Sequence, residues 1–185
     1  MTRPPRRPGK DRLVDWRLMA QTYGFIGVLE TISSFSMSYW YLERQGIPFS
    51  ALWFQYGALP ADLDPNFVAA KLNEASSIYF VNLVVMQWFN LMAIRTRRLS
   101  IFQHPPLFNK NTQNLSLFGG ILFALVFVFF WLYIPAFQRV FGTTSVPVQH
   151  FFLPMTFGLG VLFLDEARKY AVRRWPTGFF AMIAW

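Results

Sequence analysis

The residues of this sequence best suited to chemistry are three polar side chains inside long apolar segments. Gln87 and Asn90 belong to the apolar segment 75–94, and Glu30 lies a little past the middle of the segment 18–42. Gln87 and Asn90 are three residues apart, so on a helix both side chains share one face and can present carbonyl oxygens to one point. Hard cations prefer oxygen ligands, so this spacing indicates a cation-binding position, with Glu30 as a further ion or proton ligand.

A purely structural role explains the same residues. Buried amides join neighbouring membrane helices by hydrogen bonds worth about 0.6 kcal/mol each, without any part in transport. Glu30 is the only acid within an apolar segment, and an ionised carboxylate is costly there unless it is paired, hydrated or protonated. A protonated Glu30 that bonds Ser33, Thr31 or a neighbouring helix would avoid this cost, so both interpretations stay open.

Four long, nearly charge-free segments must position these side chains. They cover residues 18–42, 75–94, 115–135 and 148–164. A helix of about 20 apolar residues crosses the hydrocarbon core of a bilayer, and the segments lack the two-residue alternation of barrel strands. The sequence therefore predicts an all-α, polytopic membrane protein: a bundle of four transmembrane helices over residues 18–164, between basic segments 1–17 and 165–185.

The placement of basic residues predicts the orientation of these helices. Fourteen of the 17 lysines and arginines fall in residues 1–17, 95–114 and 165–185, which lie on one side if every segment crosses the membrane. Cytoplasmic loops carry the excess of lysine and arginine, so we expect both termini to be cytosolic. The net charge of +8 sits beside the segments, which favours contact with anionic lipid over nucleic-acid binding.

Charged residues next to two segments are expected to form an interfacial collar that anchors the helices. Opposite charges at residues 165, 166, 168 and 169 are spaced for ion pairs one helical turn apart. The predicted collar comprises Arg95, Arg97, Arg98, Asp165, Glu166, Arg168 and Lys169. Adjacent acids point about 100° apart on a helix, which argues against a paired-carboxylate catalytic site.

Metal and thiol chemistry are not expected. The chain has no cysteine, and His104 and His150 stand alone without a second ligand at helical spacing. No metal site and no cofactor of the chain itself are predicted. Small residues such as Gly119-Gly120 and Gly158-Leu159-Gly160 are expected to let helices approach closely.

Ser100 is a candidate for modification. The stretch Arg97-Arg98-Leu99-Ser100 resembles the target of a basophilic kinase. A phosphate there would add a charge of about −2 beside the arginines and alter lipid contact. The arginines are equally explained as anchors of the preceding helix at the headgroups.

Three stretches resemble the carboxy-terminal end of sodium/potassium-type P-type cation ATPases. They are MTRPPRRPGKDRLVDWRL at the start, Gln87-Trp88 followed by RTRRLSIFQ at 95–103, and DEARKYAVRRWPTG at 165–178. The order, spacing and number of apolar segments agree along the whole chain. The resemblance implies the last four membrane helices of such a pump, with Gln87 and Asn90 at cation-ligand positions of the eighth helix.

The sequence departs from this family at three places. Sodium pumps have an aspartate where this chain has Asn90, and a glutamate in the ninth helix where it has Phe123-Ala124. Glu30 could supply a carboxylate from a different direction. The outer-loop Ser-Tyr-Gly-Gln motif that holds a beta-type accessory subunit is not apparent, so that partner is not supported.

The sequence contains no Asp-Lys-Thr-Gly-Thr phosphorylation motif and no glycine-rich phosphate loop. We therefore expect no ATP hydrolysis by this chain alone, although it resembles part of an ATP-driven pump. Its expected role is to support and line the cation pathway, with membrane lipid and the remaining pump helices as partners, in the plasma membrane more than in internal ones. The alternatives are an adaptor or regulatory subunit that binds an intact transporter, and a nonfunctional gene fragment.

Overall fold

The computed structural model describes residues 16–55, 63–96, 98–107, 109–110, 113–179 and 181. The predicted basic segment 1–17 lies outside this part except for its last two residues, and so does Arg97 of the predicted collar. Every regular element in the described part is helical, which confirms the all-α class.

The first long helix is continuous but changes its winding. It begins as α1 (Trp16–Met19), widens into a π-helical segment, η1 (Ala20–Gly27), and continues as α2 (Val28–Arg44). The remaining elements are α3 (Phe49–Leu52), α4 (Pro65–Ala93), α5 (Leu115–Tyr133), α6 (Pro135–Phe141) and α7 (Gln149–Arg174). The four long helices therefore cover the four apolar segments of the sequence.

Local sequence signals determine where these helices begin and end. Asp64 caps α4 by accepting a hydrogen bond from the Asn66 N–H at 3.0 Å, and Pro65 occupies the first helical position. Helix α5 ends before Ile134, because the residue that precedes a proline is disfavoured in the helical conformation. Gly142 ends α6 with a φ of 65°, a left-handed conformation that glycine adopts without steric cost.

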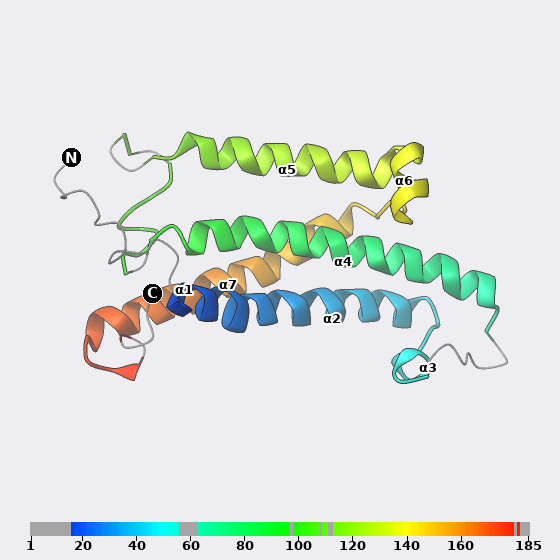
Figure 1. Cartoon of the computed structure of the whole chain (residues 1–185), viewed down its shortest axis with the longest axis horizontal. Helices are drawn as coiled ribbons and strands as arrows, with labels where there is room; N and C mark the ends of the chain where they lie inside the picture. Colours follow the sequence, from blue (N-terminus) through cyan, green and yellow to red (C-terminus); the bar gives the residue numbers. More distant parts are fainter. Residues whose placement is uncertain are drawn as a thin grey trace.

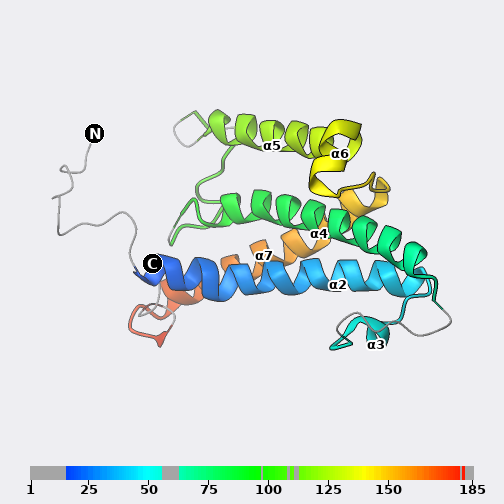
Figure 2. The same cartoon turned by 45° about the vertical axis from the view of Figure 1, so that its right-hand side comes forward.

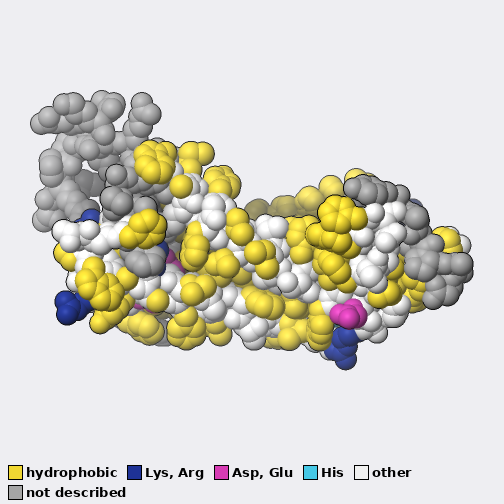
Figure 3. All heavy atoms as spheres, turned by 90° about the horizontal axis from the view of Figure 1, so that it is seen from below, with side chains coloured by type: hydrophobic (Ala, Val, Ile, Leu, Met, Phe, Trp, Pro, Cys, Tyr) yellow, Lys and Arg dark blue, Asp and Glu magenta, His cyan; other side chains and the backbone are white. Residues whose placement is uncertain are grey.

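Two helices, α4 and α5, are long and apolar enough by composition to cross a membrane. Figure 3 shows hydrophobic side chains along most of one face, with basic side chains at the left end and a basic side chain beside an acidic one toward the right. This distribution is typical of a chain that uses lipid as its solvent. Helix α7 is long, but it begins with Gln149-His150 and ends in a charged stretch, so its crossing, like that of α2, stays a prediction.

Helix α4 lies at the centre of the arrangement. It packs against α2 on one side and α7 on the other, whereas α5 contacts it less extensively (Figures 1 and 2). The end of α4, the start of α5 and the end of α7 lie at the same end of the molecule as α1 (Figure 1). We call this the basic end, because it carries the described basic residues of 95–110 and 165–174.

Packing at the centre depends on small residues at particular places. A Cβ added to Gly158 of α7 would lie 2.1 Å from the Phe89 Cδ2 atom of α4, so only glycine permits this approach. A Cβ on Gly119, Gly120 or Gly160 would meet no atom within 4 Å. The close approach predicted for these glycines is therefore found within the described chain only at Gly158.

Candidate cation site

The structure brings together the three polar residues that the sequence nominated as cation ligands. Gln87 Nε2 on α4 donates a hydrogen bond of 2.6 Å to Glu30 Oε2 on α2. Asn90 Nδ2 donates to Gln87 Oε1 at 3.3 Å, and the Asn90 side chain also interacts with the Glu30 carboxylate. The spacing of Gln87 and Asn90 predicted their shared face, but only the packing of α2 on α4 adds Glu30.

Two oxygens of this cluster have no hydrogen-bond partner among the described residues. Glu30 Oε1 and Asn90 Oδ1 are both buried and unpaired. A buried acceptor without a partner costs about 1–3 kcal/mol, so such atoms need a donor or a positive charge. A cation coordinated by one carboxylate oxygen and one amide oxygen would satisfy both, and the chemistry of the cluster therefore fits a cation.

The cluster reaches the surface of this chain through Gln87. Glu30 and Asn90 are 4% and 5% exposed, whereas Gln87 is an exposed residue. The two buried residues are thus shielded by α2 and α4, and the amide between them is accessible from outside the pair. In the described part of the chain, no group of three or more histidines, cysteines and acids could hold a metal.

A second polar contact lies further along the same helix pair. Asn82 Nδ2 donates to Ser33 Oγ at 3.1 Å and to Ser34 Oγ at 2.7 Å, and Asn82 is fully buried. Ser38 Oγ donates to the Ala75 carbonyl at 2.9 Å. These contacts fix the antiparallel register of α2 on α4, and that register is what places Glu30 opposite Gln87.

The far end of this helix pair carries a further polar network. Tyr41 donates its hydroxyl to Glu74, and Lys71 Nζ pairs with the same carboxylate at 3.0 Å. His150 packs edge-on against the Tyr41 ring, with 5.6 Å between the ring centroids. Sequence reasoning did not find this network, because its members come from three helices.

The predicted ion pairs at the basic end are present within α7. Asp165 pairs with Arg168 at 2.8 Å and with Lys169 at 2.7 Å, and Lys169 lies 3.6 Å from Glu166. Lys169, however, is only 1% exposed, and its Nζ donates to the Ala93 carbonyl of α4 at 2.8 Å. It is therefore buried between two helices, unlike a residue of a solvated collar.

The loop after α4 is held by a hydrogen bond within itself and by two hydrogen bonds to α7. Arg95 donates to the His104 carbonyl at 3.1 Å, and Arg173 donates to the Arg98 carbonyl at 2.6 Å. Glu166 accepts from the Ile101 N–H at 2.9 Å. The loop is thus held to α7 by backbone groups as much as by charges.

Ser100, the predicted modification site, lies inside this docked loop. It is 6% exposed, and its hydroxyl interacts with the Glu166 carboxylate. Burial alone would raise the pKa of Glu166, but hydrogen bonds from Ser100 and Ile101 and the charges of Lys169 and Arg173 outweigh it and lower the pKa. Phosphorylation of Ser100 therefore requires the loop to leave Glu166.

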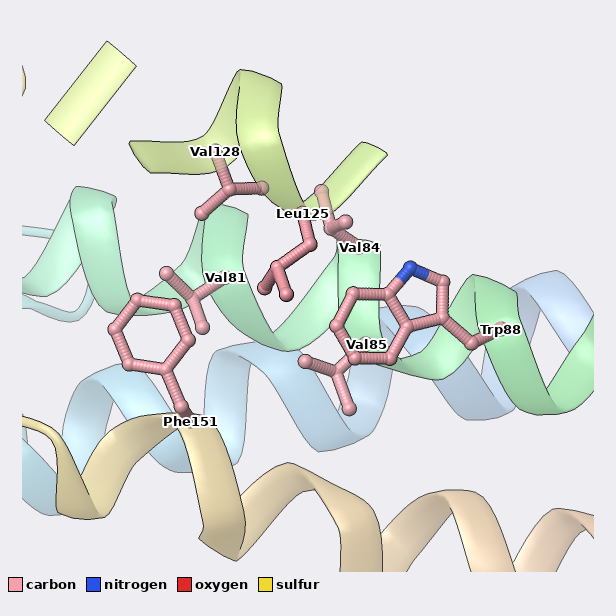
Figure 4. Close-up of a pocket in the computed structure, with 7 residues that line it drawn as sticks. All are labelled: Val81, Val84, Val85, Trp88, Leu125, Val128 and Phe151. Atoms are coloured by element: carbon pink, nitrogen blue, oxygen red, sulfur yellow. The ribbon is translucent and has the colours of Figure 1, made fainter. Parts of the chain in front are cut away.

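A small apolar crevice, too narrow to hold a water molecule, lies between α4, α5 and α7. Figure 4 shows that Val81, Val85 and Trp88 of α4 line it together with Val128 of α5 and Phe151 of α7. No charged group lines it, so it offers nothing to a cation. Phe123, where the resemblance to sodium pumps implies a glutamate, is 65% exposed on α5.

Comparison with known proteins identifies the family to which the sequence of this chain belongs. The family described as "Cation transporting ATPase, C-terminus" matches residues 1–171. The sodium/potassium-transporting ATPase subunit alpha-A of Artemia franciscana is 30% identical over 189 residues, which cover 96% of this chain. The alpha subunit of Drosophila melanogaster is 28% identical over 193 residues, and alpha-2 of Bos taurus 28% over 192.

The matched region is a small part of those relatives. The chain spans 18% of the length of each of these three proteins, while 96% of its own residues are aligned. The match covers all four long helices except the last three residues of α7. This chain therefore belongs to the family of cation-transporting ATPase C-terminal regions.

Proposed function

We propose that this chain serves as the carboxy-terminal membrane module of a P-type, sodium/potassium-type cation pump and lends Glu30, Gln87 and Asn90 to its cation pathway. The observation that carries the proposal is the 2.6 Å contact between Glu30 and Gln87, which places a carboxylate from α2 beside the amides of α4. Three residues from two helices thereby form one cluster of oxygens within the apolar part of the chain.

The charge of the cluster supports this role. The resemblance to sodium pumps implies an aspartate at the position of Asn90, which would supply one negative charge. Here Asn90 is neutral, and the nearby Glu30 provides a carboxylate from another helix. One carboxylate with amide oxygens suits a monovalent cation or a proton better than Ca²⁺, which takes 6–8 oxygen ligands and several carboxylates.

In this proposal the other parts of the pump supply the energy. The chain alone hydrolyses no ATP and needs no cofactor, and the transport helices and cytosolic domains come from a partner polypeptide or from the rest of a longer chain. All four long helices cross the plasma membrane with both termini cytosolic. Placement of the described basic residues of 95–110 and 165–174 at one end supports that orientation.

Substitution within an assembled pump tests the cation role. Glu30→Gln, Gln87→Leu and Asn90→Leu are each expected to weaken activation by Na⁺ or K⁺ roughly tenfold or more, as the loss of a coordinating or charged group does. Ser36→Ala is the matched control, because Ser36 lies on the exposed side of α2 and bonds only the Ile32 carbonyl of its own helix. Unchanged cation affinity in all three site variants would contradict the proposal.

An adaptor that binds an intact transporter is the second candidate, and one observation favours it. Only 11% of the apolar window of α5 is buried within this chain. Leu122, Phe123 and Phe127 are exposed along it, so another protein's helices could cover that surface as well as lipid could. Co-purification of the chain with a complete pump that already has its own last four helices would support the adaptor.

A further inference from the structure

Lys169 is the least exposed charged side chain in the described part of the chain. It lies on α7 with an exposed fraction of 1%, and its ammonium group is 2.7 Å from Asp165 Oδ2. The long side chain does not turn toward the headgroups, as lysines near the ends of membrane helices commonly do. It points instead at α4, where its Nζ donates to the Ala93 carbonyl at 2.8 Å.

The atom that Lys169 binds belongs to the last turn of α4. Ala93 is the final residue of that helix, and its carbonyl is among those that have no partner within the helix. The carboxy-terminal end of a helix also carries partial negative charge, which attracts an ammonium group. Lys169 therefore caps α4 from a neighbouring helix, by hydrogen bond and by charge.

The same turn of α4 carries Asn90 of the candidate cation site. The Ile94 N–H donates to the Asn90 carbonyl at 2.9 Å, which closes the turn that Lys169 holds at Ala93. Asn90 in turn donates to Gln87, and Gln87 donates to Glu30. A continuous set of contacts therefore joins the buried lysine of α7 to the carboxylate of α2.

We propose that Lys169 is a positioning residue for this site: by capping α4 at Ala93, it fixes the turn from which Asn90 and Gln87 reach Glu30. This inference rests on the proposed function only where it concerns the effect of Lys169 on cation affinity. Its structural part, that Lys169 sets the hydrogen bonding of Glu30, stands on the contacts themselves. The polar contacts of Lys169 within the described residues are to Ala93, Asp165 and Glu166 and include no member of the cluster, so its effect is transmitted through α4.

Arg168 provides a matched control for this inference. It is adjacent to Lys169 in sequence and shares the partner Asp165, with its Nε 2.9 Å and its Nη2 2.8 Å from Asp165 Oδ1. Within the described residues it forms no hydrogen bond to α4. Removing the charge of Arg168 thus disturbs the same acid without releasing the cap on Ala93.

The experiment compares Lys169→Met with Arg168→Met in the full chain reconstituted in lipid nanodiscs. Hydrogen exchange of the amides at 90–94 reports the last turn of α4. The infrared carboxyl or carboxylate band of Glu30, assigned with Glu30→Gln, reports its hydrogen bonding. Lys169→Met is expected to speed exchange at least about tenfold and to shift the Glu30 band, while Arg168→Met leaves both unchanged.

A second variant separates positioning from general destabilisation. Lys169→Met leaves Asp165 buried with one cation fewer, which destabilises the chain by itself. Replacing the acid together with both of its cations, as in Asp165→Leu with Arg168→Met and Lys169→Met, removes these ion pairs without leaving one member unpaired, but it does not restore the cap. We expect this triple variant to recover the thermal midpoint of the wild-type chain while the Glu30 band stays shifted.

The outcomes are distinct. An unshifted Glu30 band in both variants, or an equal shift in Arg168→Met, overturns the inference. Titration of the assembled pump with Na⁺ or K⁺ in place of choline then tests the functional part, with affinity expected to fall roughly threefold to thirtyfold in Lys169→Met. A shifted band together with unchanged cation affinity in the assembled pump would contradict the proposed function and leave the positioning role supported.

Discussion

At the scale of single residues, the structure contains both a buried amide that joins two helices and a separate cluster of candidate cation ligands. Asn82 bonds Ser33 and Ser34 and leaves its own Oδ1 unpaired, whereas Gln87 bonds the only acid of the apolar segments. Asn82 thus acts as a packing residue, and the Gln87 cluster carries the oxygens that suit a cation.

The packing role of Asn82 predicts a measurable loss of stability. Asn82→Leu removes two hydrogen bonds between α2 and α4 and should lower the free energy of unfolding by about 1 kcal/mol, given about 0.6 kcal/mol per bond in membranes. Thermal unfolding of the reconstituted chain, followed by circular dichroism, measures it. Ser36→Ala, which alters only a bond within α2, should leave the transition in place. Equal effects of the two changes would contradict the assigned role.

The lowered pKa of Glu166 predicts that the loop after α4 detaches from α7 in acid. Its folded-state pKa lies below the ordinary value of 4.5, so its contribution to stability is present above pH 4.5 and is lost as the pH falls through the lowered pKa. The protection factor of the Ile101 amide, which bonds Glu166, should therefore fall below that pH. In Glu166→Gln this fall in protection with acid should disappear, and its persistence would assign the effect to another group.

The same contact governs access to Ser100. Because Ser100 is buried against Glu166, a purified basophilic kinase should modify the wild-type chain slowly. Glu166→Ala weakens the docked loop and is expected to speed phosphorylation several-fold, measured by mass spectrometry over time. Arg168→Met, which leaves the loop contact intact, serves as the control. Failure of kinase activation to modify Ser100 in either chain would leave the arginines as membrane anchors only.

At the scale of elements, α4 determines how the others are placed. It presents Asn82 and Gln87 to α2, and its Phe89 ring lies against Gly158 of α7. Interhelical contact in membranes depends on such small residues, since lipid is as apolar as the side chains. Helix α5 has no comparable contact and is correspondingly exposed.

Substitution of the two glycines of α7 by alanine should affect the stability of the chain differently. Gly158→Ala places a methyl group against the Phe89 ring and should destabilise the chain by about 1–3 kcal/mol. Gly160→Ala meets no neighbouring atom within 4 Å and should be neutral or stabilise the helix by up to about 1 kcal/mol. Thermal unfolding of both variants tests this, and similar shifts would show that the contact with Phe89 is not close.

At the scale of the whole molecule, membrane topology is the property on which the other proposals depend. Reporters of cytosolic location fused to residue 1 and to residue 185 should both be active if all four long helices cross the membrane. A third reporter inserted within residues 56–62, between the first two predicted crossings, should be inactive. An odd number of crossings would place the two terminal reporters on opposite sides and would exclude the four-helix topology.

The sequence by itself determined which parts of this chain are helical and apolar, and where its charges lie. Those properties depend on hydropathy and on residues near in sequence, so α4, α5 and the shared face of Gln87 and Asn90 were predictable. The stretches that resemble P-type pumps also predicted the family. The one-turn spacing of residues 165–169 predicted ion pairs that the structure contains.

Only the tertiary structure decided which residues meet between helices. The contact of Glu30 with Gln87 depends on the rotation and register of α2 on α4, and no local pattern specifies either. Lys169 was expected in an interfacial collar, yet α7 crosses the end of α4 and buries it against Ala93. These pairings are set by the packing of helices far apart in sequence, which explains why the helix positions and the three candidate residues followed from the sequence, whereas the contacts between those residues did not.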